Sequence, residues 1–219
     1  MNYVPGDPRD QLAHVGFDVV RAGLVVGSGG NLSARLPEDP DVCWVTAAGT
    51  WLDRLNRPSF VRMRISTGDV LDDIVPPSTE VALHLATYRM RPDATAIVHL
   101  HPQTLLLLDV LDEPVQVLTT DHAFYLRRVV TAPFYPPGST ELAAAAAAAV
   151  ADGTNCVVLA SHGCSVLGDS IELAHKRARN LEEAAQLTYR LLTLPRAGKP
   201  RELPPAFLDL LDNDPSVAI

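Results

Sequence analysis

The chain has 219 residues, of which 47% are apolar and 20% are charged, so it can bury a substantial core without disulfide or metal crosslinks. Its 26 acidic and 18 basic side chains give a formal net charge of −8, and the absence of a basic cluster disfavours nucleic acid as a partner. No apolar run approaches the roughly 20 residues that cross a bilayer, which disfavours a membrane protein.

These features predict one cytoplasmic α/β domain. The separated Cys43, Cys156 and Cys164 are typical of reduced thiols inside a cell, because they form no CxxC pair. The N-terminal segment lacks the basic start and apolar core of a signal peptide. We expect the domain to span residues 1–219, with a tail from about residue 195 whose structure the sequence leaves open.

The first third of the chain predicts a helix followed by a hairpin region. Asp7 is a candidate N-cap, Pro8 occupies the first helical position, and Gly23 is expected to end this amphipathic helix. The glycine-rich segment 27–31 then leads into strands. The strand-like segments cover residues 32–36, 42–46 and 60–66.

The middle of the chain predicts a helix, a strand and a second helix. Ser78 or Thr79 can cap a helix over residues 80–89. Residues 95–100 are rich in strand formers, and an apolar helix is expected over residues 103–110.

The last third of the chain predicts two strand regions and two helices. A strand is expected within residues 127–134, and the alanine-rich segment 139–153 is a helix by propensity. Residues 156–168 predict a strand, a turn that contains a histidine, and a second strand. A long amphipathic helix then begins after Ser170 as its cap.

Two histidines at the end of a predicted buried strand indicate chemistry. His99 and His101 are two residues apart, so on a strand both rings project from the same face. A catalytic zinc ion usually has three protein ligands and one open position. His162 is the best candidate for the third ligand, because it follows an apolar strand and Gly163 permits a sharp turn there.

Glu80 is a candidate fourth group, because the N-terminal dipole of its predicted helix favours a carboxylate. A His-x-His pair is also found in ordinary hydrogen-bonded positions, so the pair alone does not establish a metal site. His14, His84 and His175 lie within predicted helices and are assigned ordinary structural roles. His84, one turn after Glu80, is expected to orient that carboxylate or to pack.

Three segments together resemble the class II aldolase and adducin family, in particular its sugar-phosphate aldolase branch. They are GSGGNLSAR at residues 27–35, STEVALHLATYRMRPDATAIVHLHP at 78–102 and VVLASHGCSVLGDSIELAHKRARNLEEAAQL at 157–187. They occur in the family's order, and the resemblance extends from the first predicted helix to about Leu192. It implies a three-layer α/β/α fold with a central, mostly antiparallel sheet, assembled as a homotetramer with active sites between subunits.

The resemblance also implies roles for the candidate residues. His99, His101 and His162 would hold Zn²⁺, and three imidazoles also accept Mn²⁺ or Co²⁺. Glu80 would ligate the metal at rest and act as general acid/base once substrate displaces it. The family's phosphate-binding positions correspond to Gly30, Asn31, Ala48, Gly49, Ser78 and Thr79.

This sequence departs from the family pattern at two places. The loop that usually carries a hydroxyl reads Thr46-Ala47-Ala48-Gly49, so a non-phosphorylated hydroxy-ketone or hydroxy-acid substrate stays open. No tyrosine occurs near Leu118, where the aldolases have a proton donor that acts in the neighbouring subunit. Asp121, His122 and Tyr125 are the candidates in its place.

The implied activity is retro-aldol cleavage of a small ketose phosphate, such as L-fuculose 1-phosphate, or a related ketol through a metal-stabilised enediolate. Epimerase, dehydratase and decarboxylase relatives use similar chemistry and remain alternatives. A non-catalytic, adducin-like interaction module is the alternative of a different class. The epimerase branch carries aspartate where this chain has Glu80, which favours the aldolase branch.

Overall fold

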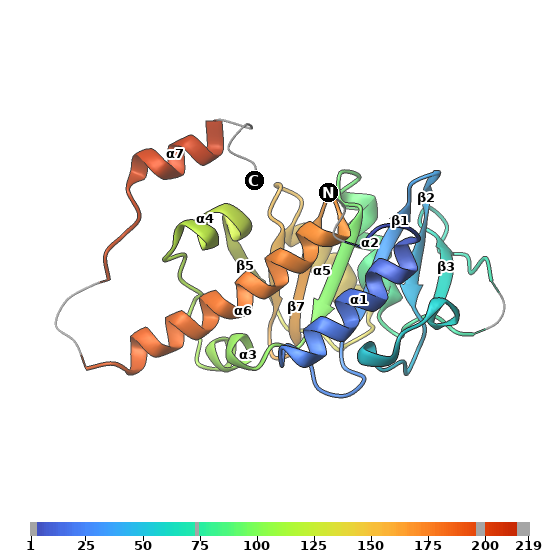
Figure 1. Ribbon diagram of the computed structural model, residues 1–219, viewed down its shortest axis with the longest axis horizontal. Helices are drawn as coiled ribbons and strands as arrows, with labels where there is room; N and C mark the ends of the chain where they lie inside the picture. Colours follow the sequence, from blue (N-terminus) through green and yellow to red (C-terminus); the bar gives the residue numbers. More distant parts are fainter. Residues whose placement is uncertain (1–3, 73–74, 196–199, 214–219) are drawn as a thin grey trace.

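The computed structural model describes residues 4–72, 75–195 and 200–213. Its strands form one sheet in the order β3-β2-β1-β4-β7-β6-β5, in which only the β5–β6 pair is parallel (Figure 1). The strands are β1 Asn31–Leu36, β2 Asp39–Thr46, β3 Phe60–Arg64, β4 Ala96–Leu100, β5 Val129–Ala132, β6 Cys156–Leu159 and β7 Gly163–Gly168.

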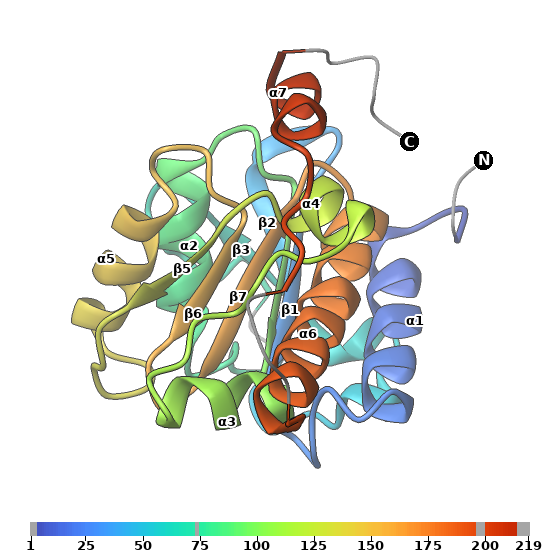
Figure 2. The same cartoon turned by 90° about the vertical axis from the view of Figure 1, so that its left-hand side faces the viewer.

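Helices cover both faces of this sheet. The helices are α1 Pro8–Arg21, α2 Val81–Met90, α3 Gln103–Val110, α4 Thr120–Leu126, α5 Thr140–Ala149, α6 Ile171–Thr193 and α7 Pro205–Asn213, with short 3₁₀ turns η1 Leu52–Arg54 and η2 Arg57–Ser59. Figure 2 shows α1 and α6 on one face and α2 and α5 on the other. The predicted three-layer fold with a mostly antiparallel sheet is therefore confirmed.

The sheet separates two halves of the core, and its central strand β4 contributes side chains to both. Val98 and Leu100 pack with residues of α1 and α6, whereas Ile97 packs with residues of α2 and α5. Because side chains alternate along a strand, His99 projects from the same face as Ile97. The first ring of the histidine pair is thus directed toward the layer that contains α2.

Most sequence-predicted elements lie where they were expected. The Asp7 carboxylate accepts the Arg9 N–H at 2.9 Å and caps α1, and Ser170 caps α6 by accepting the Leu173 N–H. The predicted cap of α2 is wrong in detail, since Glu80 itself occupies the N-cap position and makes no side-chain capping bond. Its carboxylate is directed to the histidines instead of the helix amides.

Two helices were not predicted. Helix α4 is only 7 residues long and depends on a local cap, in which the Thr119 hydroxyl accepts the His122 N–H. Helix α7 lies in the tail that begins near residue 195, part of which falls outside the described residues. Across the described parts of the chain, no helix is both long and apolar enough to cross a bilayer.

Candidate metal centre

Four side chains from three parts of the chain converge at one end of the sheet. Each offers one ligand atom, and these atoms lie within 4.8 Å of one another. His99 Nε2 is 3.1 Å from Glu80 Oε2 and 3.1 Å from His101 Nε2, and His162 Nε2 is 3.2 Å from Glu80 Oε1. The structure thus brings together Glu80, His99, His101 and His162.

Strand pairing explains how His162 reaches the pair. In the β4–β7 ladder Leu100 pairs with Cys164, so the turn that precedes β7 lies beside the end of β4. A Cβ atom at Gly163 would overlap the Leu100 carbonyl oxygen and the His101 ring. Glycine is therefore required there for close approach, whereas the left-handed backbone of this turn is at Ser161, with φ of 56°.

A second contact fixes the orientation of the His99 ring. Its Nδ1–H donates to the Cys164 carbonyl oxygen at 2.9 Å, which leaves Nε2 directed at the cluster. Metal-binding histidines commonly use the second ring nitrogen in this way. In the neutral form of His99, the lone pair of Nε2 faces the Glu80 carboxylate. Both groups are electron-rich, and a cation between them would stabilise the pair.

The residues present fit a divalent cation. Glu80 Oε1 is buried and accepts no hydrogen bond, although it lies beside His162. Three imidazole nitrogens and one carboxylate oxygen form a donor set that zinc accepts, as do manganese, cobalt and iron. His99 is 0% and Glu80 8% exposed, whereas His101 and His162 are half-buried.

Protonation states also suit a cation. Burial lowers the pKa of His101 to about 4, with the neighbouring His99 as a further cause. Burial alone would raise the pKa of Glu80, but protonated rings of His162 and His99 hold that pKa well below its usual range, and a cation would supply the same positive charge when the rings are neutral. A neutral imidazole and an ionised carboxylate are the forms that coordinate metals.

A polar pocket of about 150 Å³ opens beside the cluster, with Glu80 and His101 in its lining. The six residues predicted to bind phosphate also line it: Gly30, Asn31, Ala48, Gly49, Ser78 and Thr79. The structure therefore groups these residues, and their role toward a phosphate stays a prediction.

Hydrogen bonds limit what two of the six can donate. The Ala48 N–H donates to the Pro76 carbonyl and the Ser78 N–H to the Thr46 carbonyl, so both backbone donors are already engaged. Ala48 also lacks a hydroxyl. Ser78 Oγ accepts the Glu80 N–H at 3.2 Å, which leaves the hydroxyl hydrogen available to a ligand.

The three candidate proton donors lie elsewhere in the same chain. Asp121, His122 and Tyr125 are on α4, which packs against α6 on the opposite face of the sheet from α2. His122 Nε2 is 3.2 Å from Glu183 Oε2, and Tyr125 packs against the core on that face. Neither Asp121 nor Tyr125 belongs to the metal cluster of its own chain, and action on a neighbouring subunit stays a prediction.

Sequence reasoning expected His84 to orient Glu80 or to pack, but it missed the other buried polar groups behind Glu80. Asn31 Nδ2 donates to Glu80 Oε2 at 3.0 Å, and Ser33, His84 and Tyr88 continue the hydrogen bonding away from the pocket. A signal was present in the sequence. Glu80, His84 and Tyr88 recur every four residues on one helix, and Asn31 and Ser33 share one face of a strand.

The sheet, its helical layers and the histidine–carboxylate cluster define an α/β protein with a group of side chains that could hold a metal ion. Comparison with known sequences gives the family: the Class II Aldolase and Adducin N-terminal domain matches residues 10–189. The chain belongs to the class II aldolase and adducin family, as the resemblance predicted.

Two relatives with different named activities match the chain. The L-fuculose phosphate aldolase of Methanococcus maripaludis (strain C5) is 32% identical over 167 residues, which cover 75% of this chain and 86% of the relative. The 3-oxo-tetronate 4-phosphate decarboxylase of Haemophilus influenzae is 32% identical over 191 residues, covering 84% and 87%. Among solved structures, an L-fuculose 1-phosphate aldolase matches with a TM-score of 0.81 and 28% identity over 95% of both chains.

Proposed function

We propose that the protein is a zinc-dependent lyase that cleaves a small ketose phosphate, such as L-fuculose 1-phosphate, or a related ketol by a retro-aldol reaction. The observation that carries this proposal is the convergence of three histidines and Glu80 beside a polar pocket. Similarity to an L-fuculose phosphate aldolase over 75% of the chain supports the reaction class.

The candidate residues divide the chemistry between binding and proton transfer. His99, His101 and His162 would hold the cation, which when bound supplies Lewis-acid stabilisation of the negative charge that develops on substrate oxygens. Glu80 would take the proton from the substrate hydroxyl group on the carbon that becomes the aldehyde when the carbon–carbon bond breaks. General acid–base groups of this kind typically contribute about 10² to 10⁴ in rate.

The pocket supports a small anionic or polar substrate. The Ser78 hydroxyl hydrogen is available, and the backbone turns at Gly30 and Gly49 have φ values of 76° and 71° that bring main chain to the pocket. Backbone amides in such turns bind phosphate oxygens. We assign the phosphate to the side of the pocket that these residues line.

The donor of the second proton would come from a second chain. Asp121 or Tyr125 would supply the second proton from a neighbouring subunit of a homotetramer, since both lie on the opposite sheet face of their own chain. The negative net charge of −8 agrees with a small-molecule substrate rather than nucleic acid, and we place the protein in the cytoplasm.

Decarboxylation is the second candidate. The Haemophilus influenzae relative named as a decarboxylase matches a longer segment, 191 residues, than the Methanococcus maripaludis aldolase does at 167. Loss of carbon dioxide from a 3-oxo acid also places negative charge on a carbonyl oxygen, so the same cluster suits either reaction. The difference would depend on contacts that select the substrate.

The two reactions are separated by product analysis. Zinc-loaded protein is incubated with L-fuculose 1-phosphate while dihydroxyacetone phosphate is measured, and with 3-oxo-tetronate 4-phosphate while carbon dioxide is measured. We expect dihydroxyacetone phosphate, and we expect His99→Ala to lose both zinc and turnover. Carbon dioxide alone would assign the decarboxylase, whereas an active, zinc-free His99→Ala variant would contradict both candidates.

A further inference from the structure

A row of buried polar side chains leads from Glu80 into the core between α2 and β1. His84 and Ser33 are 0% exposed, Tyr88 is 1% and Asn31 is 4% exposed. Leu32 and Ala34, which alternate with the polar residues of β1, pack on the opposite side of the sheet. The polar residues of β1 therefore face α2, where His84 and Tyr88 lie one and two turns beyond Glu80.

Hydrogen bonds connect the row without a gap. Tyr88 OH lies 2.8 Å from Ser33 Oγ, and Ser33 Oγ lies 2.6 Å from His84 Nδ1. His84 Nε2 makes a short contact with Asn31 Oδ1, and Asn31 Nδ2 donates to Glu80 Oε2 at 3.0 Å. We call Tyr88, Ser33, His84 and Asn31 the polar relay.

Chemistry fixes the direction of the bonds between Ser33 and Glu80. An ionised carboxylate can only accept, so the Asn31 amide presents its nitrogen to Glu80 and its oxygen to His84. His84 Nε2 therefore carries the hydrogen, and in the neutral ring Nδ1 accepts from the Ser33 hydroxyl. These donors all point toward the carboxylate. Tyr88 OH, at the far end, lies within hydrogen-bond distance of both Ser33 Oγ and the Thr95 carbonyl oxygen.

The relay leaves the two oxygens of Glu80 in different situations. Oε2 accepts from Asn31, whereas buried Oε1 accepts no hydrogen bond and lies on the His162 side of the cluster. Burial also lowers the pKa of His84 to about 3, so the ring is neutral and its Nδ1 can accept from Ser33.

We propose that His84, Ser33 and Tyr88 are positioning residues that act through Asn31 to hold the Glu80 carboxylate in the orientation that ligates the cation. The inference rests on the proposed function only in that the cluster holds a divalent cation, and it is independent of which reaction follows. A buried polar network stabilises a fold only when every member is bonded, so loss of one member releases the next. Removal of the relay therefore frees Asn31 and then the carboxylate.

The test compares two substitutions at one position. His84→Leu keeps a similar volume but removes the donor, whereas the amide of His84→Gln can still donate to Asn31. Zn²⁺ affinity is measured by competition with a chromogenic chelator, and coordination is measured from the visible spectrum of the Co²⁺-substituted protein. Substitution of a residue that supports a metal ligand by hydrogen bonding typically weakens metal affinity about 10- to 100-fold. We expect that loss for His84→Leu, with an altered Co²⁺ spectrum, and substantial recovery of both for His84→Gln.

Leu85→Ala is the matched control, because Leu85 is a buried neighbour on α2 with an aliphatic side chain that cannot take part in the hydrogen bonds of the relay. It should lower thermal stability and leave the Zn²⁺ affinity and Co²⁺ spectrum unchanged. If His84→Leu does not fold, Ser33→Ala removes a single hydroxyl and should give a smaller change in the same direction.

Wild-type Zn²⁺ affinity and Co²⁺ spectrum in folded His84→Leu would overturn the inference; if that variant does not fold, the same result in Ser33→Ala would do so. The inference would also be overturned if His84→Gln showed no recovery. A Leu85→Ala variant that loses Zn²⁺ affinity as much as His84→Leu would overturn it as well. None of these readouts uses a substrate. A protein that binds Zn²⁺ through an intact relay but cleaves no ketose phosphate would therefore contradict the proposed function and leave this inference standing.

Discussion

At the scale of single residues, substitution of Glu80 separates proton transfer from metal binding. Glu80→Gln keeps the shape of the side chain but removes the ionisable group, while the three imidazoles stay in place. We expect the zinc content to persist with weaker affinity and kcat to fall by about 10² to 10⁴. Zinc analysis together with steady-state kinetics checks this, and a kcat equal to that of the wild type would exclude Glu80 as the acid/base.

The histidines of the cluster could be predicted from the sequence because they depend on local geometry. His99 and His101 are two residues apart at the end of a strand, and His162 lies in the turn before β7. The bond from Asn31 to Glu80 joins positions 49 residues apart, so only the folded chain shows it. Asn31 is predicted to bind phosphate; its side chain is bonded to Glu80 and His84, and a role toward phosphate stays a prediction.

At the scale of elements, local signals predicted most of the fold. Capping residues indicated the starts of α1 and α6, and the run of strand formers indicated β4. Helix α4 was missed because 7 residues carry too little periodicity to show an amphipathic face. Helix α2 begins at Val81 rather than at Glu80, because the backbone of Glu80 has φ of −103° and ψ of 17° and is not helical.

A contact between a histidine of α6 and an aspartate of α1 predicts that the stability of the fold depends on pH. His175 on α6 is 2.7 Å from Asp18 on α1, and burial lowers the pKa of His175 despite the opposing effect of that carboxylate. The unfolded chain therefore binds the proton more readily, so stability is present above a pH of about 6.5 and falls as the pH drops below it.

Urea unfolding of the zinc-loaded protein at pH 7.5 and 5.5 measures this effect. We expect the wild type to lose more stability between these values than His175→Gln does, because the variant lacks the titrating ring. The comparison between variants cancels the common contribution of the metal centre. An identical loss in both proteins would show that His175 does not contribute.

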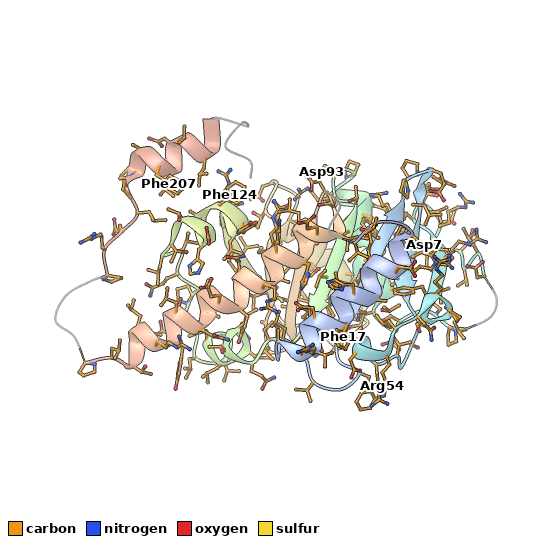
Figure 3. All side chains as sticks on the ribbon, in the orientation of Figure 1. Asp7, Phe17, Arg54, Asp93, Phe124 and Phe207 are labelled. Carbon is orange, nitrogen blue, oxygen red and sulfur yellow. The ribbon has the colours of Figure 1, made fainter. Side chains whose placement is uncertain are left out.

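At the scale of the whole molecule, α7 extends from the body beyond α4 (Figures 1 and 2). Figure 3 shows Phe207 on α7 and Phe124 on α4 at this same end of the molecule. Leu208 and Leu210 of α7 are exposed within the chain. Contacts between chains leave little trace in one sequence, so Asp121 and Tyr125 are only candidates for a donor that acts on a neighbouring subunit.

Assembly can be measured directly. Because Asp121 and Tyr125 lie on the opposite sheet face from the cluster of their own chain, the proposed second proton requires a neighbouring subunit. We expect static light scattering of the purified protein to give the mass of four chains. A monomer at concentrations that retain activity would exclude these two residues as donors.

Anomalous X-ray scattering at the zinc absorption edge, from crystals of the zinc-loaded protein, shows directly whether the cluster holds the metal. We expect a strong peak between the Nε2 atoms of His99, His101 and His162, within coordination distance of the Glu80 carboxylate. A peak at another place, or none at this cluster, would contradict this expectation.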